Sequence, residues 1–143
     1  MSFHTFVDEI KNSRIAIISL IIAIFAVTYS TWRDEETEKN RNIRMASFEA
    51  LKNLGELQIV INYAHYQPDY PMGNPFFGWG HMMLINDMGE LLPEPIPEAF
   101  KKLAGVWGED WSKLKTDSTA VERITTEVDN SRNAVVHLIQ GLR

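Results

Sequence analysis

The side chains most able to bind a metal or to transfer protons in this sequence are four histidines and nineteen Asp or Glu residues. No two histidines lie three to five residues apart, no H-E-x-x-H motif occurs, and no Glu stands three residues before a histidine, as a di-iron site would need. His65 and His81 could meet across an intervening loop, with Asp69 or Asp87 nearby. Isolated histidines beside aromatic rings more often donate to a backbone oxygen, so we predict no metal site and no cofactor. The four histidines are His4, His65, His81 and His137.

Sequence motifs of nucleophilic and phosphate-binding enzymes are absent. There is no G-x-S-x-G, no P-loop and no GxGxxG, and the lack of cysteine excludes disulfides, iron–sulfur clusters and thiolate zinc sites. Carboxylate pairs for glycoside hydrolysis could be drawn from Glu90, Glu94 and Asp110, but any acidic helical domain offers such pairs. We therefore predict that the protein is not an enzyme and assign no catalytic residue.

The best candidate for function is a group of aromatic residues between positions 63 and 79. Part of it lies in Gln67–Gly80, where three Pro and three Gly predict a loop. Three interpretations stay open. The rings fill the end of a helical domain, they form a contact patch for a partner or a small ligand, since Tyr and Trp combine apolar area with a polar group, or they rest on the membrane. This predicted aromatic patch consists of Tyr63, Tyr66, Tyr70, Phe76, Phe77 and Trp79.

Residues 15–32 would hold such a patch near a membrane; they read IAIISLIIAIFAVTYSTW. These eighteen residues have no charge, Pro or Gly, and as a helix they extend ~27 Å, close to the ~30 Å of a bilayer core. A buried core helix is rarely apolar all round, and a cleaved signal peptide would need an A-x-A site that is missing here. We predict one transmembrane helix with Arg14, Tyr29, Trp32 and Arg33 as membrane-interface anchors.

Two long apolar stripes with heptad spacing predict the main helices of the remaining chain. Such stripes form an intramolecular core more often than a dimer seam. No Gly or Pro occurs between Ile15 and Gly55, so we expect the anchor helix to continue into the first of them. The two stripes consist of Ile43, Ser47, Ala50, Leu54, Leu57, Ile61 and Ala64, and of Val121, Ile124, Val128, Ser131, Val135, Leu138 and Leu142.

Two shorter helices are expected between the stripes, one from Trp79 to Leu92 and one beginning at Pro97. Asp117, Ser118 and Thr119 supply capping oxygens for the last helix, and Glu122 is spaced to complete a capping box with Thr119. The predicted fold is all-α: one N-terminal transmembrane helix continuing into an antiparallel, four-helix-bundle-like soluble domain. The second shorter helix has the stripe Ile96, Phe100, Leu103, Trp107, Trp111 and Leu114.

We divide the chain into an N-terminal tail (1–14), the transmembrane helix (15–32), a charged stalk (33–42) and the helical soluble domain (43–143). In the tail, the spacing of four apolar residues predicts an amphipathic turn or two at the membrane interface, with a loose terminus as the alternative. From residue 33 onward, twelve Lys or Arg stand against seventeen Asp or Glu. This acidic balance repels polyphosphate, so nucleic acid is not an expected partner. The four tail residues are Phe3, Phe6, Val7 and Ile10.

Charge near the anchor gives two opposite indications of its orientation. A bare count of cations favours a cytoplasmic C-terminal domain. Lys11 and Arg14 adjoin one end of the anchor, however, whereas Arg33 is followed at once by Asp34 and two glutamates. We expect the soluble domain on the outer face, periplasmic or extracellular, with the cytoplasmic face as the alternative.

A membrane anchor, a helical domain and no catalytic motif together indicate a structural role. We expect a single-pass accessory or assembly subunit whose partners are the lipid bilayer and either another protein or a second copy of itself. The alternative is a membrane-tethered, ligand-sensing module, which would need a partner for its output.

Overall fold

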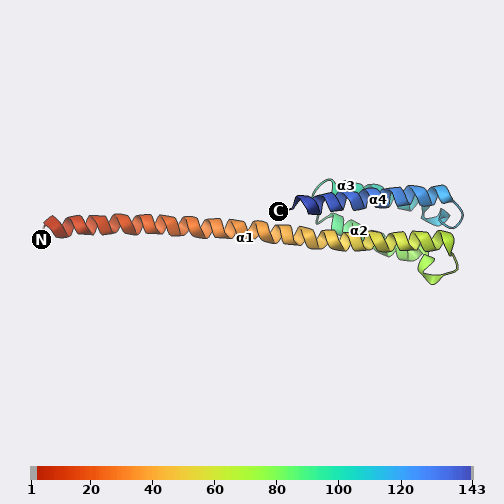
Figure 1. The fold of residues 1–143 in the computed structure, drawn as a ribbon, viewed down its shortest axis with the longest axis horizontal. Coiled ribbons are helices and arrows are strands. Elements are labelled where there is room, and N and C mark those ends of the chain that lie inside the picture. Colours follow the sequence, from red (N-terminus) through yellow and green to blue (C-terminus); the bar gives the residue numbers. More distant parts are fainter. Residues whose placement is uncertain (1–2, 143) are drawn as a thin grey trace. The chain divides into compact units, whose positions relative to one another are not determined.

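In a computed structural model, which describes residues 3–142 and the side chains of residues 13–142, the protein is all-helical, as predicted. The helices are α1 (Phe3–Tyr66), α2 (Pro75–Gly89), α3 (Ile96–Asp110) and α4 (Ser118–Gly141), with short 3₁₀ helices η1 (Pro71–Gly73) and η2 (Trp111–Lys113) between them (Figure 1). No strand occurs among the residues described. The chain forms two compact units, residues 1–39 and 40–143.

In the first unit, helix α1 includes one stretch long and apolar enough to span a membrane. None of the most apolar part of this stretch is buried, so it is not a core helix within this chain. The hydroxyls of Thr28 and Thr31 donate to the carbonyls of Ile24 and Val27, at 2.8 and 3.0 Å. Two of the few polar side chains in the stretch therefore satisfy their donors within the helix, as an apolar surrounding requires.

The predicted interface anchors are all exposed on α1. Arg14 and Arg33 bracket the apolar stretch, and the rings of Tyr29 and Trp32 lie 6.3 Å apart between centroids. The side chains of Phe3, Phe6, Val7 and Ile10, on which the interfacial turn was predicted, lie outside the described residues. The helix itself is uninterrupted from Phe3 to Tyr66, so the expected helical continuation beyond the apolar stretch is confirmed.

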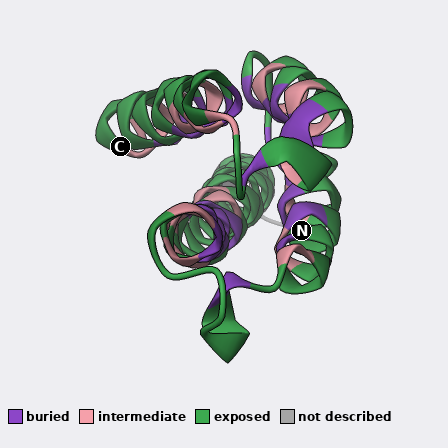
Figure 2. Ribbon diagram, turned by 90° about the vertical axis from the view of Figure 1, so that its right-hand side faces the viewer, coloured by how far each residue is buried: buried purple, intermediate pink, exposed green. Residues whose placement is uncertain are grey.

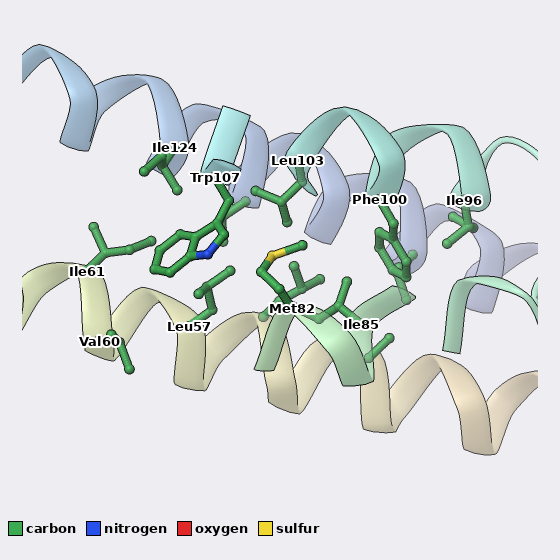
Figure 3. Close-up of a cluster of buried hydrophobic side chains, with 14 of the residues drawn as sticks. Leu57, Val60, Ile61, Met82, Ile85, Ile96, Phe100, Leu103, Trp107 and Ile124 are labelled. Atoms are coloured by element: carbon green, nitrogen blue, oxygen red, sulfur yellow. The ribbon is translucent and has the colours of Figure 1, made fainter. Parts of the chain in front are cut away.

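In the second unit, all four helices contribute to one hydrophobic core cluster. Buried faces turn toward a common centre and exposed faces turn outward (Figure 2). The close-up in Figure 3 shows Leu57 and Ile61 of α1, Met82 of α2, Trp107 of α3 and Ile124 of α4 converging on this centre. Its largest buried side chains are Trp107 and Phe100.

The apolar stripes of the sequence are the faces that enter this core. In the first stripe every residue except Ile43 is buried, and Ile43 packs against the cluster. In the last stripe Ile124, Val128, Ser131 and Val135 are buried. Residues at i, i+3, i+4 and i+7 lie on one side of a helix, so the spacing alone identified the inward side chains.

The start of α2 corrects the sequence interpretation, because Gln67–Gly80 was predicted to be a loop throughout. Helix α2 instead begins at Pro75, and η1 occupies Pro71–Gly73. The side chain of Asn74 accepts a hydrogen bond from the Phe76 N–H at 3.0 Å, and Pro75 occupies the first turn, where its missing N–H costs nothing. An N-cap and an N-terminal proline thus start a helix that the Gly content argued against.

The cap of α4 is a second correction. Asp117, not Thr119, is the N-cap residue, and its carboxylate accepts hydrogen bonds from the N–H groups of Thr119 and Ala120 at 2.9 and 3.3 Å. The predicted capping box of Thr119 and Glu122 is therefore wrong by two positions. A carboxylate at this place also interacts favourably with the positive end of the helix dipole. A neutral threonine hydroxyl would do so less strongly.

Gly78 sets how closely α2 and α3 approach each other. A Cβ atom at this position would lie 2.3 Å from the ring of Trp107, which is fully buried. An indole ring held on all sides cannot move out of the way by rotating one bond. The absent side chain of Gly78 is therefore the space that Trp107 occupies.

We expect Gly78→Ala to lower the free energy of unfolding of the full chain by about 1–3 kcal/mol, because it overpacks the core. Gly80→Ala, in the same helix, is the matched control: nothing lies within 4 Å of its Cβ, and alanine should stabilise the helix by up to ~1 kcal/mol. Chemical denaturation followed by tryptophan fluorescence measures both. Equal effects of the two substitutions would contradict the proposed contact.

Candidate interaction surface

Helix α2 is apolar on two opposite sides. Its inward side consists of Gly78, Met82, Ile85 and Gly89, all buried, at steps of four, three and four residues. The only polar side chains between Pro75 and Gly89 are His81, Asn86 and Asp87. A helix with an apolar surface all round is normally covered on every side, so the outward side of α2 is unusual for a solvent-exposed helix.

The outward side of α2 exposes large side chains. Phe76 is 70% exposed, Met83 66% and Phe77 57%, and Leu91, just beyond the helix, is 63% exposed. Assuming ~200 Å² for each fully exposed large side chain, they and their neighbours present on the order of 600 Å² of apolar surface. That is the upper end of what monomers usually expose, and such patches mark contact sites. We call this set the α2 outer surface; it consists of Phe76, Phe77, Trp79, Met83, Leu84 and Leu91.

The aromatic part of the α2 outer surface rests on tryptophans of α3 and η2. The ring centroid of Trp79 lies 6.2 Å from that of Trp107 and 6.1 Å from that of Trp111, both in edge-to-face geometry. The ring centroid of Phe76 lies 5.8 Å from that of Trp111, with the two ring planes tilted by 56°. Contacts between aromatic rings restrict their orientation. Phe76 and Trp79 are thus held in place although they remain exposed.

The other residues of the predicted aromatic patch lie in different contacts. Tyr63 stacks on Tyr70 with 4.9 Å between ring centroids, and Tyr66 meets His65 edge-on at 4.8 Å. Among the described side chains, no ring contact joins these tyrosines to the tryptophan group. The structure thus divides the patch: Phe76, Phe77 and Trp79 belong to the α2 outer surface, and Tyr63, Tyr66 and Tyr70 lie around the end of α1 and the loop that follows.

A buried carboxylate fixes η2, and with it Trp111. Asp110 is fully buried; it accepts a hydrogen bond from Lys113 Nζ at 2.9 Å, and Arg123 Nη2 of α4 contacts both of its oxygens. The hydrogen bond from Lys113 and the adjacent Arg123 guanidinium hold the pKa of Asp110 below its ordinary value, although burial acts in the opposite direction. The network ties the end of α3 to α4 beside the aromatic cluster.

The two histidines considered for metal binding have separate hydrogen bonds. His65 Nδ1 lies 2.8 Å from the carbonyl oxygen of Leu114, so this nitrogen must carry the proton and donate. His81 Nδ1 lies 3.1 Å from Asn53 Oδ1, while the Asn53 amide donates to the Glu49 carbonyl. Within residues 13–142, no group of three or more His, Asp or Glu side chains could hold a metal ion.

Several surface depressions accompany the helices of the second unit, including one of about 300 Å³ between α3 and α4. One, of about 320 Å³, lies between α2 and α3 and includes Glu90, Phe100 and Lys101 in its lining. Another, of about 310 Å³, lies between α1 and α4, and its lining mixes polar side chains such as Gln58, Asn62 and Glu122 with apolar surface. The side-chain oxygen of Gln58 is buried without a hydrogen-bond partner in the described part of the chain.

Sequence reasoning missed four members of the exposed surface and its support: Met83, Leu84, Leu91 and Trp111. Trp111 was assigned to a core stripe, and it does pack against the core cluster, but its support of the exposed surface was not foreseen. The scarcity of polar residues in Pro75–Gly89 could have indicated an exposed apolar surface, because a helix with one solvent-exposed side normally has more polar residues.

No protein-family model, no curated protein and no solved structure matches this chain. The α2 outer surface is the feature on which a function can be proposed.

We expect Asp110→Asn to lower the free energy of unfolding by about 1–2 kcal/mol at neutral pH, because it weakens charge-assisted bonds to two half-exposed cations. The pKa of Asp110 is lower in the folded than in the unfolded protein. Its stabilisation is therefore present above the unfolded pKa of about 3.9 and is lost as the pH falls through the folded pKa.

The difference between wild type and Asp110→Asn should accordingly shrink between about pH 7 and about pH 3. Urea denaturation at both pH values measures it. Asp129→Asn, at an exposed position of α4, is the matched control and should change the free energy of unfolding by no more than ~0.5 kcal/mol. A difference between wild type and Asp110→Asn that does not depend on pH would contradict the role of the ion pairs.

Proposed function

We propose that the protein is a single-pass membrane protein whose helical domain serves as an accessory or assembly subunit. Residues 15–32 are the proposed membrane span, and residues 43–143 are the proposed antiparallel four-helix bundle. The observation that carries the proposal is the α2 outer surface: a covered inward side and an exposed apolar outward side on the same helix.

The membrane anchor is supported by the length, apolarity and full exposure of the stretch in α1. Side chains such as Ile22 and Phe25 are 63% and 71% exposed, which costs free energy in water and none in lipid. The intrahelical hydrogen bonds of Thr28 and Thr31 are of the kind tolerated in hydrocarbon.

An antiparallel bundle is supported by contacts at both ends of the second unit. His65, near the end of α1, donates to Leu114, which precedes α4. Arg44, much earlier in α1, donates to the carbonyl of Leu142 just after α4, at 2.9 Å. The end of α1 thus lies near the beginning of α4, and an earlier part of α1 lies near the end of α4, the antiparallel arrangement that heptad-spaced helices adopt in up-and-down bundles.

A ligand-sensing role is the second candidate, and the depression between α1 and α4 favours it because its lining includes several polar side chains. Its lining offers amide, hydroxyl and carboxylate groups, and Gln58 Oε1 is an acceptor without a partner among the described residues. Such a lining suits a small polar molecule. This role needs no protein contact at α2, which separates it from the accessory-subunit proposal.

We expect a photoreactive amino acid at position 83 to crosslink the protein to a discrete protein partner in its own membrane. The same group at Val136, an exposed apolar position of α4, is the matched control and should give no such adduct. Gel electrophoresis after irradiation measures both. If irradiation left only the uncrosslinked chain at both positions, the accessory-subunit role would be wrong and the ligand-sensing role favoured.

The side of the membrane can be determined with a single introduced cysteine, since the chain has none. We expect Asn133→Cys, at an exposed position of α4, to react with a membrane-impermeant maleimide on intact cells, because we propose that the domain lies on the outer face. Labelling only after the cells are lysed would place the domain in the cytoplasm and contradict the proposed orientation.

A further inference from the structure

The segment of the chain that contains α2 has acidic residues and no Lys or Arg over a long range. Residues 53–100 include no Lys or Arg, and their acidic residues are Glu56, Asp69, Asp87, Glu90, Glu94 and Glu98. On α1, the last cation before this range is Lys52, which already lies 3.5 Å from Glu49. The exposed apolar surface therefore has acidic groups near it and no cation of its own helix or of the adjoining loops.

Asp87 is placed where the helix itself makes a negative charge unfavourable. It follows Met83 by four residues, so it lies on the same side of α2 as the apolar side chains. It is also in the last turn, where the helix dipole is negative and where Lys, Arg or His would normally stabilise the helix. The last turn of α2 has no basic residue, and among the described residues Asp87 has no hydrogen-bond or ion-pair partner.

Glu90 extends the negative end of the surface but is partly compensated. It shares the lining of the α2–α3 depression with Lys101. Asp87 does not line this depression. It also takes part in no ion pair among the described residues. The uncompensated charge thus lies at Asp87, next to Met83 at the C-terminal end of an apolar stripe.

We propose that the α2 outer surface binds a basic amphipathic helix of a partner protein. Its apolar side chains would cover Phe76, Phe77 and Met83, and a Lys or Arg would pair with Asp87. In such helix-to-helix recognition, apolar anchors supply affinity and a charge sets the register. The inference rests on the proposed function and adds the chemistry of the partner to it.

Two other occupants fit these charges less well. A second copy would bring the same acidic surface, without a cation in residues 53–100 to offer to Asp87. An anionic lipid surface attracts Lys and Arg and repels carboxylates, so it would be held away from Asp87 and Glu90. A basic helix is the occupant that satisfies the apolar area and the charge together.

The test uses the full chain in nanodiscs of zwitterionic phosphatidylcholine, with empty nanodiscs as background. The probe is a fluorescent designed helical peptide with one Leu side and one Lys side, and its counterpart has Glu in place of Lys. We expect the Lys peptide to bind at least about tenfold more tightly than the Glu peptide, as measured by fluorescence anisotropy. Equal binding of the two peptides would overturn the proposal.

Substitutions then locate the binding. Asp87→Lys and Met83→Ser should each weaken binding of the Lys peptide at least about tenfold, whereas Asp129→Lys, the same charge change on α4, should leave it within about twofold. Asp87→Asn should weaken binding while raising the midpoint of thermal unfolding, because it removes an unfavourable charge from the helix end. A purely structural Asp87 would lower that midpoint instead. Equal loss with Asp87→Lys and Asp129→Lys would overturn the proposal.

Two further measurements test whether a lipid surface or a second copy of the chain covers the α2 outer surface instead. Vesicles of phosphatidylcholine with phosphatidylglycerol are the lipid probe, and a photoreactive group at position 83 reports contact with a second copy. Engagement of position 83 by the vesicles or by a second copy, without peptide binding, would overturn the basic-helix proposal.

The results distinguish failure of the proposed function from failure of the basic-helix proposal. If position 83 crosslinks to a partner in native membranes but the peptides bind equally, the surface docks a protein and its proposed basic chemistry is wrong. If the Lys peptide binds at Asp87 but no partner crosslinks in native membranes, the chemistry stands and the accessory-subunit role is wrong.

Discussion

The contact between Trp107 and Gly78 is the constraint on which the second unit depends. Trp107 is the largest fully buried side chain, and Figure 3 shows its ring among residues of α1 and α4 while α2 passes close by. A full indole fits there only because the neighbouring helix lacks a Cβ at position 78. Since α2 is short and its other inward positions are Met82, Ile85 and Gly89, this contact also fixes its height and rotation. The rotation in turn decides which of its side chains face outward.

A second close approach fixes the loop that leads into α2. A Cβ at Gly73 would lie within 2.9 Å of the α1 backbone at Tyr63 and Ala64. The 3₁₀ turn of η1 therefore lies directly on α1, and Tyr70 reaches Tyr63 to stack on it. Asn74 then caps α2 immediately afterwards. The glycines and prolines that suggested an irregular loop are thus the residues that let the chain turn tightly and begin a new helix.

The helices with one apolar stripe were predictable from the sequence, and the helix with two was not. Heptad spacing places Leu54 and Val128 inward whatever their partners are, so the inward sides of α1, α3 and α4 followed from period alone. In α2, spacing cannot choose between Met82 and Met83, because both sides are apolar. Only the packing of Gly78 against Trp107 makes the choice. The exposed surface could not be found for the same reason, and Trp111, which supports it, resembled one more core residue.

An exposed surface of this kind has a cost when it is uncovered. Phe76, Phe77 and Met83 face solvent in the free chain, and chaperones and proteases recognise such side chains. On the proposed function, copies made in excess of the partner would display them and be removed, while bound copies would persist. The amount of this protein in a cell would then follow the amount of its partner, so that α2 would regulate stoichiometry as well as assembly.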